Sequence, residues 1–213
     1  MIVVPESLLP SPLLRQALAG VAISHIAHLL SCFVLYALTL RLLPAGFREG
    51  DRRAAATLAA CLHVLSPAGV FLSATSPEAL FSFWNFLSFL WLSYSAGEAP
   101  TVWHKVNNGL GAIGAGCAFA AASTIRGNGL LSAAAFAVHA FPIALRVLSG
   151  TIALADSWAF ACLVAGAVVT VLGFAYPQYL AYTRYCTDDA ALARPWCDKI
   201  PPSIFTFVQA HYW

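Results

Sequence analysis

Long segments without charged residues dominate this sequence and constrain its fold more than any other feature. Apart from Glu78 and Arg146, which lie near their ends, these segments contain no Asp, Glu, Lys or Arg. A helix needs about 20 mainly apolar residues to cross the hydrocarbon core of a bilayer, so each segment predicts a membrane-spanning helix. The predicted spans lie near residues 17–40, 54–73, 78–96, 109–125, 130–148 and 158–176.

The composition also indicates a membrane environment. Of the 213 residues, 60% are hydrophobic and 9% are charged, whereas a soluble domain carries about 25% charged residues. We therefore expect an all-α polytopic membrane protein with about six transmembrane helices in residues 1–176, in contact with membrane lipids. Residues 177–213 are expected to form a loop segment outside the membrane. The net charge of +2 is too small to indicate a nucleic-acid partner.

The loop at residues 41–53 gives the predicted orientation. Short loops rich in Lys and Arg tend to lie in the cytosol, and this loop contains Arg41, Arg48, Arg52 and Arg53. Counting spans from it places residues 76–78, residues 126–129 and the segment 177–213 together on the non-cytosolic side.

Glu78 is the acidic residue at the predicted membrane boundary on that side. It follows Ser76, a good N-cap residue, and Pro77, which suits the first helical position. Its carboxylate could contact a substrate or act as an acid–base group. The stronger interpretation from the sequence alone is a helix-capping carboxylate, which makes Glu78 a weak catalytic candidate.

Arg126 lies between two strongly apolar stretches and is followed by Gly127, Asn128 and Gly129. The glycines predict a break or a tight turn at this point. A guanidinium in such a place can bind phosphate oxygens in bidentate fashion. A snorkelling arginine at a helix end is the alternative, but the neighbouring glycines leave room for a ligand, so we favour phosphate binding.

His25 and His28 are three residues apart and therefore share a helix face. No third ligand and no HExxH pattern accompany them, so we expect a polar pair packed between helices and no metal. The remaining thiols within spans have the character of small apolar residues. These are Cys32, Cys61, Cys117 and Cys162.

The segment 177–213 contains Cys186 and Cys197, with ten residues between them. In an oxidising lumen these two would be a plausible disulfide pair, and further ligands for a cysteine-based metal site are missing. The end of the segment mixes aromatic and polar side chains, which suits either an interfacial aromatic belt or a platform for a saccharide or lipid head group. These residues are Phe205, Phe207, Gln209, His211, Tyr212 and Trp213.

Four stretches, in this order and between spans, resemble the GPI mannosyltransferase 2 (PIG-V) family. They read SPAGVFLSATSPEALFSF, STIRGNGLL, PQYLAYTRYC and RPWCDKIPPSIFTFVQAHYW. The last is the most specific, and the resemblance covers most of the chain from about Pro67 onward. It implies part of a GT-C fold in the endoplasmic reticulum membrane.

The resemblance also implies an activity and a set of site residues. Such an enzyme would be a glycosyltransferase that transfers the second mannose from dolichyl phosphate mannose to the GPI precursor glycolipid in the lumen, without a further cofactor. The resemblance is also compatible with a small membrane subunit as a partner. The substrate-binding candidates that follow are Arg126, Asn128, Gln209, His211 and Trp213.

The chain departs from the family in one respect that bears on catalysis. The resemblance implies an acidic motif in a first luminal loop, after an upstream span, yet the first residues offer only Glu6. Family members continue with more spans beyond the point where this chain stops. We therefore expect a piece truncated at both ends, whose own activity is open.

Two other functions fit parts of the sequence. Spans rich in small residues together with an arginine near the membrane would suit a transporter, and a polar tail would suit a non-catalytic assembly subunit. A transporter should gather its polar groups near the membrane midplane. Here they gather at one predicted surface, which favours the glycosyltransferase.

Overall fold

The computed structural model describes residues 11–66, 69, 72, 74–95, 101–150, 154–187, 194–198, 200 and 202–212. Within this part of the chain every regular element is helical, which confirms the all-α prediction. The elements are α1 (Pro12–Leu42), α2 (Glu49–Val64), α4 (Glu78–Ser95), α5 (Val102–Ile125), the 3-10 helix η2 (Gly127–Ser132), α6 (Ala133–Leu148), α7 (Leu154–Tyr185) and α8 (Ile204–Tyr212).

Four segments among the described residues are long and apolar enough to cross a membrane, so the chain is membrane-embedded. They are Pro12–Leu42, Trp103–Ile125, Gly127–Arg146 and Ser157–Tyr185. The predicted count of six spans is not confirmed. Helix α2 has 16 residues and is about 24 Å long at 1.5 Å per residue, less than the roughly 30 Å hydrocarbon core. Helix α4 contains Glu78, Asn85 and several serines, which lower its mean hydropathy.

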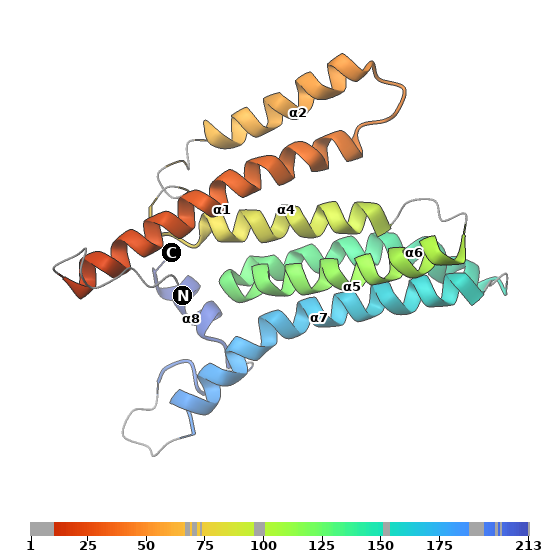
Figure 1. Cartoon of the computed structure of the whole chain (residues 1–213). Coiled ribbons are helices and arrows are strands. Elements are labelled where there is room, and N and C mark those ends of the chain that lie inside the picture. Colours follow the sequence, from red (N-terminus) through yellow and green to blue (C-terminus); the bar gives the residue numbers. More distant parts are fainter. Residues whose placement is uncertain are drawn as a thin grey trace.

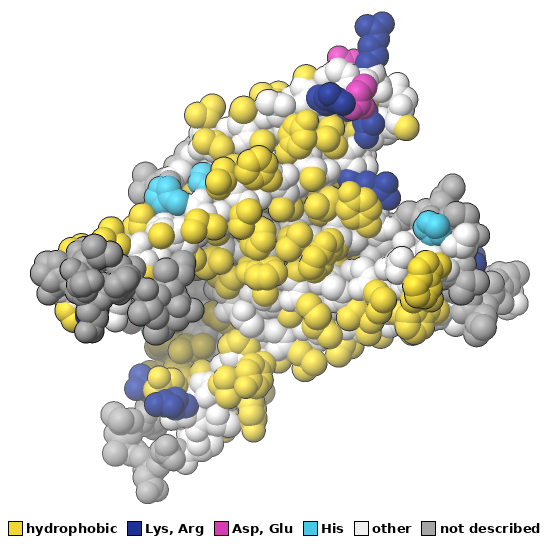
Figure 2. All heavy atoms as spheres, viewed as in Figure 1, with side chains coloured by type: hydrophobic (Ala, Val, Ile, Leu, Met, Phe, Trp, Pro, Cys, Tyr) yellow, Lys and Arg dark blue, Asp and Glu magenta, His cyan; other side chains and the backbone are white. Residues whose placement is uncertain are grey.

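Helix α5 lies at the centre of the bundle, where it packs against α4 and α7, and α1 packs against the other side of α4 (Figure 1). Helix α2 packs mainly on α1. Hydrophobic side chains cover the middle of the face seen in Figure 2, while Lys, Arg, Asp and Glu side chains lie toward its rims. This distribution matches a molecule whose middle faces lipid.

Small residues bring α5 and α7 into backbone contact. A Cβ atom added to Gly116 would lie 2.5 Å from the Cα of Gly166, and one added to Gly173 would lie 2.4 Å from the Cα of Ala120. No side chain fits into such gaps, so glycine is required there. Such close approach is typical of membrane helices rich in glycine and alanine, as α5 is.

The core forms around Phe119 of α5. Its ring makes edge-to-face contacts with Phe89 of α4, at 5.0 Å between centroids, and with Phe136 of α6, at 5.8 Å. Edge-to-face geometry is a favoured arrangement of aromatic rings. The buried residues of this cluster are Leu92, Ala112, Ala115, Phe119, Phe136, Ile143, Cys162 and Leu163.

The last predicted span ends at residue 176, just before Pro177, whereas the helix α7 continues through this proline to Tyr185. A proline inside a helix removes one backbone hydrogen bond and crowds the carbonyl four residues earlier. In a membrane helix such a defect is tolerated, since neighbouring groups satisfy the freed carbonyl. The segment 177–213 is accordingly not only a loop, because it holds the last turns of α7 and all of α8.

Candidate functional site

A salt bridge joins Glu78 in the first turn of α4 to Arg126, the residue that ends α5. The Arg126 Nη1 donates to Glu78 Oε1. The second carboxylate oxygen, Oε2, accepts a hydrogen bond of 2.8 Å from the Ser76 hydroxyl. The Glu78 side chain is 27% exposed and that of Arg126 42% exposed, so the pair is partly desolvated and still accessible from outside.

The surroundings of this pair tie it to a third helix. The Ser24 hydroxyl of α1 donates to the Ser76 carbonyl oxygen at 3.4 Å. The guanidinium carbon of Arg126 lies 6.0 Å from the centre of the Phe81 ring, at the outer limit of a cation–π contact. Residues from α1, α4 and the end of α5 therefore meet at one end of the bundle.

The backbone breaks at Arg126, as the glycines after it predicted. Arg126 is extended, with φ −141° and ψ 130°, and its N–H donates to the Ala122 carbonyl at 2.9 Å. The Gly129 N–H then donates to the Arg126 carbonyl at 2.9 Å as η2 begins. A Cβ atom on Gly129 would lie 2.8 Å from the backbone of Ser123, so only glycine allows the chain to fold back this closely.

Helix α8 docks beside this break. Its Phe205 ring stacks on Phe174 of α7, with centroids 5.8 Å apart, and both rings lie next to Gly127, where an added Cβ would be 3.3 Å from Phe174 and 3.4 Å from Phe205. The Ile204 N–H at the start of α8 donates to Gln178 Oε1 at 3.1 Å. Figure 1 shows α8 at the end of the bundle where α4 begins.

The chain between α7 and α8 is held by a disulfide bond between Cys186 and Cys197, with their Cα atoms 5.6 Å apart. Trp196, next to the second cysteine, is only 3% exposed, and the Arg194 guanidinium lies 4.7 Å from the Tyr185 ring centre. These contacts fix the described part of the tail to the end of α7.

The structure places the predicted substrate-binding residues unevenly. Asn128 is exposed in η2, directly after Arg126. His211 is exposed in the last turn of α8, where its Nδ1–H donates to the Phe207 carbonyl at 2.9 Å. The side chain of Gln209 and the whole of Trp213 lie outside the described residues. Arg126 and Asn128 thus share one end of the bundle with α8, and sequence reasoning did not anticipate the pairing of Arg126 with Glu78.

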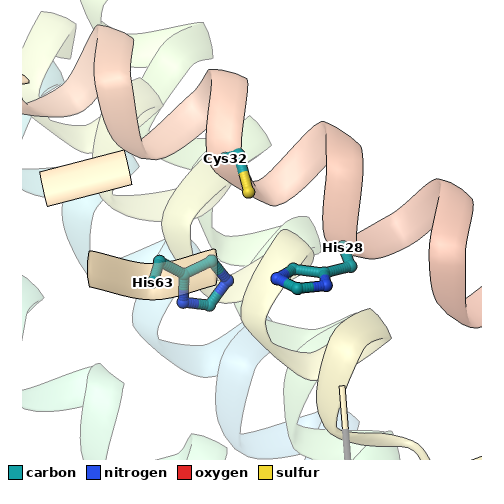
Figure 3. A group of neighbouring side chains, drawn as sticks. All are labelled: His28, Cys32 and His63. Carbon is teal, nitrogen blue, oxygen red and sulfur yellow. The ribbon is translucent and has the colours of Figure 1, made fainter. Parts of the chain in front are cut away.

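The structure separates the two histidines that the sequence predicted as a pair. His25 is exposed and its Nδ1–H donates to the Val21 carbonyl at 2.9 Å. His28 instead faces His63 of α2, with ring centroids 5.1 Å apart and an interplanar angle of 85°. Cys32 lies beside them (Figure 3). The spacing of His28 and Cys32 along α1 could have signalled a shared face, but His63 required knowledge of how α1 and α2 pair.

Comparison with known proteins gives a family for this chain. A family model described as a mannosyltransferase (PIG-V) matches residues 3–213. The chain is 38% identical over 200 residues to GPI mannosyltransferase 2 of Aspergillus oryzae, which covers 92% of the chain and 44% of that relative. It is 36% identical over 198 residues to GPI mannosyltransferase 2 of Gibberella zeae, covering 93% of the chain and 44% of the relative.

A mammalian relative is similar as well. GPI alpha-1,6-mannosyltransferase 2 of Rattus norvegicus is 34% identical over 181 residues, which cover 73% of the chain and 33% of that protein. The chain therefore spans less than half the length of these curated relatives. No solved structure matches it. The nearly complete coverage by the family model, together with these relatives, shows that the chain belongs to the mannosyltransferase (PIG-V) family.

Proposed function

We propose that this chain forms part of a membrane glycosyltransferase that adds the second mannose to the GPI precursor, with dolichyl phosphate mannose as the donor. The observation that carries this proposal is the family match over residues 3–213. Relatives named for GPI mannosyl transfer support the acceptor class. Neither comparison supports the transporter or the assembly subunit.

The proposed reaction places a specific demand on the protein. A hydroxyl oxygen of the GPI acceptor forms a bond to C1 of the donor mannose while the bond from C1 to the phosphate oxygen breaks. The hydroxyl proton passes to a base, and dolichyl phosphate departs with increased negative charge on its phosphate. A fixed cation beside that phosphate lowers the barrier, because it stabilises charge that develops in the transition state.

Arg126 is the residue that meets this demand best. Its guanidinium has five N–H donors in a rigid fork, and the salt bridge to Glu78 occupies Nη1. Among the described residues no acceptor is found for the other N–H groups of the Arg126 guanidinium. The part-exposed guanidinium can therefore hold Glu78 with one edge and bind a phosphate oxygen with another.

Glu78 fits a positioning role better than that of a catalytic base. One carboxylate oxygen accepts from Arg126 and the other accepts from Ser76 at 2.8 Å, so both oxygens face donors. A base needs an oxygen free to take the acceptor proton. We propose that Glu78 orients Arg126, and we assign no base within the described residues.

The same end of the molecule would face the lumen of the endoplasmic reticulum. The Cys186–Cys197 bond supports this placement, since disulfides persist in oxidising compartments such as that lumen. Asn128 and His211, both exposed, are proposed contacts for the saccharide part of the substrates, as are Gln209 and Trp213.

A hybrid protein tests the proposed function without depending on how much of the enzyme this chain represents. In the Aspergillus oryzae relative, the 200 matched residues would be replaced by those of this chain and the rest kept. The hybrid, this chain alone or the intact relative would be expressed in a strain that lacks its own second GPI mannosyltransferase. Microsomes would then be prepared from each strain.

The expected result is conversion of the one-mannose GPI precursor to the two-mannose form by the hybrid, at a rate within about tenfold of the intact relative. Thin-layer chromatography of labelled precursors would measure it. A hybrid that inserts in the membrane at normal abundance and transfers no mannose would contradict the proposal.

A further inference from the structure

Three side chains with metal-binding atoms converge between α1 and α2: His28, Cys32 and His63 (Figure 3). One ligand atom from each lies within 4.8 Å of the others. His28 and Cys32 are four residues apart on α1 and therefore share a helix face. His63 comes from the last turn of α2, and its ring also contacts Phe86 of α4 edge-on at 5.3 Å.

The imidazole of His28 supplies evidence that this cluster takes a ligand. Its Nε2 is buried and has no hydrogen-bond partner among the described residues. Buried polar atoms in native proteins nearly always have a partner, and a bound water or ion is one explanation of an exception. Figure 3 shows a ring nitrogen of His28 directed toward His63, so a ligand between the two rings would satisfy it.

The Ser31 hydroxyl contacts both histidine residues. It donates to the His28 carbonyl oxygen at 2.7 Å and lies 2.9 Å from Nε2 of His63. Which group donates across the second contact depends on the tautomer of His63. In the tautomer that is protonated on Nδ1, the lone pair of Nε2 can bind a metal.

We propose that His28, Cys32 and His63 form a zinc site. Two imidazoles and one thiolate are a donor set suited to Zn²⁺, which usually has four tetrahedral ligands, so a water molecule would complete the set. Binding would release the Cys32 thiol proton to solvent and leave a Zn²⁺–thiolate bond. Ligand atoms around tetrahedral zinc lie roughly 3.3–3.6 Å apart, so the three atoms, which lie within 4.8 Å of one another, would approach by at most about 1.5 Å on binding.

The site would lie apart from the residues proposed for mannosyl transfer. Helix α2 packs mainly on α1, and the zinc would join the end of α2 to the middle of α1. Glu78 and Arg126 belong to other helices and contribute no ligand. The proposal therefore does not rest on the proposed function, and metal binding can be measured in a protein that transfers no mannose.

Cobalt substitution tests the site directly. The purified full chain in detergent would be stripped with a chelator and titrated with Co²⁺, whose bond to a thiolate gives a charge-transfer band in the near ultraviolet. One equivalent of Co²⁺ should produce this band together with visible bands of tetrahedral intensity. Zn²⁺ should displace the Co²⁺ and raise the melting temperature of the stripped wild-type protein.

The variants are His28→Gln, Cys32→Ser and His63→Gln, matched with His25→Gln and Cys61→Ser. Loss of even an outer partner of a metal ligand weakens binding by about 10- to 100-fold, so each of the first three should weaken Co²⁺ binding at least as much. Cys32→Ser should also abolish the charge-transfer band. The two controls should bind as the wild type does.

Wild-type protein without a thiolate band, or a band that survives in Cys32→Ser, would overturn the proposal. Equal loss in Cys61→Ser would do so as well, because it would place the thiolate elsewhere. The stripped and the zinc-loaded wild type are the same polypeptide, so misfolding of a variant cannot explain a missing shift in melting temperature between them. A missing shift would therefore also count against the site.

Discussion

Glu78 and Arg126 are 48 residues apart in the sequence and form a salt bridge between the first turn of α4 and the residue that ends α5. The bridge is part-buried, and the Ser76 hydroxyl holds the second carboxylate oxygen at 2.8 Å. It therefore fixes the direction of a guanidinium at a helix end, where a flexible side chain would otherwise sample many rotamers.

Replacing Arg126 should slow mannosyl transfer far more than it affects folding. In the hybrid enzyme, Arg126→Ala should lower the turnover rate by about 10²- to 10³-fold, the range found when one transition-state donor is removed. Arg126→Lys should recover part of the rate, because lysine keeps the positive charge but lacks the planar set of N–H donors of a guanidinium. Initial rates at varied dolichyl phosphate mannose would measure both.

Arg53→Ala is the matched control, since Arg53 pairs with Glu49 on an exposed surface at the start of α2. It should transfer mannose at the wild-type rate. Glu78→Gln should cost about tenfold or less, because a neutral amide oxygen still accepts a weaker hydrogen bond. A normal rate for Arg126→Ala would remove the phosphate-binding role.

The Cys186–Cys197 bond should stabilise the tail because it restricts the conformations available to the unfolded chain. Its two cysteines are 11 positions apart, and a loop of this size contributes about 3 kcal/mol through chain entropy. Cys186→Ser, Cys197→Ser and the double variant should therefore lower the melting temperature equally. Cys61→Ser, which removes an exposed free thiol, should not.

Alkylation with a mass-tagged maleimide before and after reduction would show the bond itself. Two additional thiols should react only after reduction of protein isolated from the membrane. Reaction of both cysteines without reductant would contradict the bond and the luminal placement of the tail.

The contact of α5 with α7 predicts unequal effects for two glycines on the same helix. A Cβ atom on Gly116 would meet the Gly166 backbone at 2.5 Å, whereas one on Gly114 would meet the movable Trp91 side chain at 3.3 Å. Gly116→Ala should destabilise the protein by about 1–3 kcal/mol through overpacking. Gly114→Ala should be near neutral, because the gain of up to about 1 kcal/mol in helix propensity offsets the contact.

Thermal unfolding in detergent, followed by circular dichroism, would compare the two. Equal melting temperatures for both variants would show that α5 and α7 do not approach as closely as the structure has them.

Removing the Gln178 side chain should loosen α8. Its Oε1 accepts from the Ile204 N–H at 3.1 Å, and losing one such partner costs about 1 kcal/mol. For Gln178→Ala we expect amide hydrogen exchange in α8 to be about fivefold faster, while α5 stays unchanged. Gln16→Ala, at an exposed position of α1, is the control. Unchanged exchange in α8 would mean that Phe174 and Phe205 alone hold it.

Local patterns in the sequence predicted much of the helical structure. The serine and proline before Glu78 indicated where α4 begins, and the glycines after Arg126 indicated where α5 ends. Both are consequences of backbone preferences that act within a few residues. The same local reasoning placed the end of the last span before Pro177, whereas α7 continues through the proline, which membrane helices tolerate where neighbouring groups satisfy the freed carbonyl.

Contacts between distant segments could not be predicted in this way. The sequence placed Glu78 and Arg126 on one side of the membrane, but no periodicity within either helix specifies that their side chains meet. The partner of His28 was likewise assigned to His25, three residues away, instead of His63 on the next helix. Such pairs depend on the relative rotation and height of two helices, which a single sequence does not display.

The backbone contact between α5 and α7 also restricts how the molecule can move. Helices that touch through layers of large side chains can slide by small steps, because rotamers adjust between them. At Gly116 the nearest atoms of α7 are backbone atoms of Gly166, and at Gly173 the nearest atoms of α5 belong to the small residue Ala120. No large side chain can adjust at these two points, so we expect α5 and α7 to move as one unit. Arg126 ends α5 and Gln178, which accepts a hydrogen bond from α8, lies on α7, so a tilt of the pair would carry the guanidinium and α8 together.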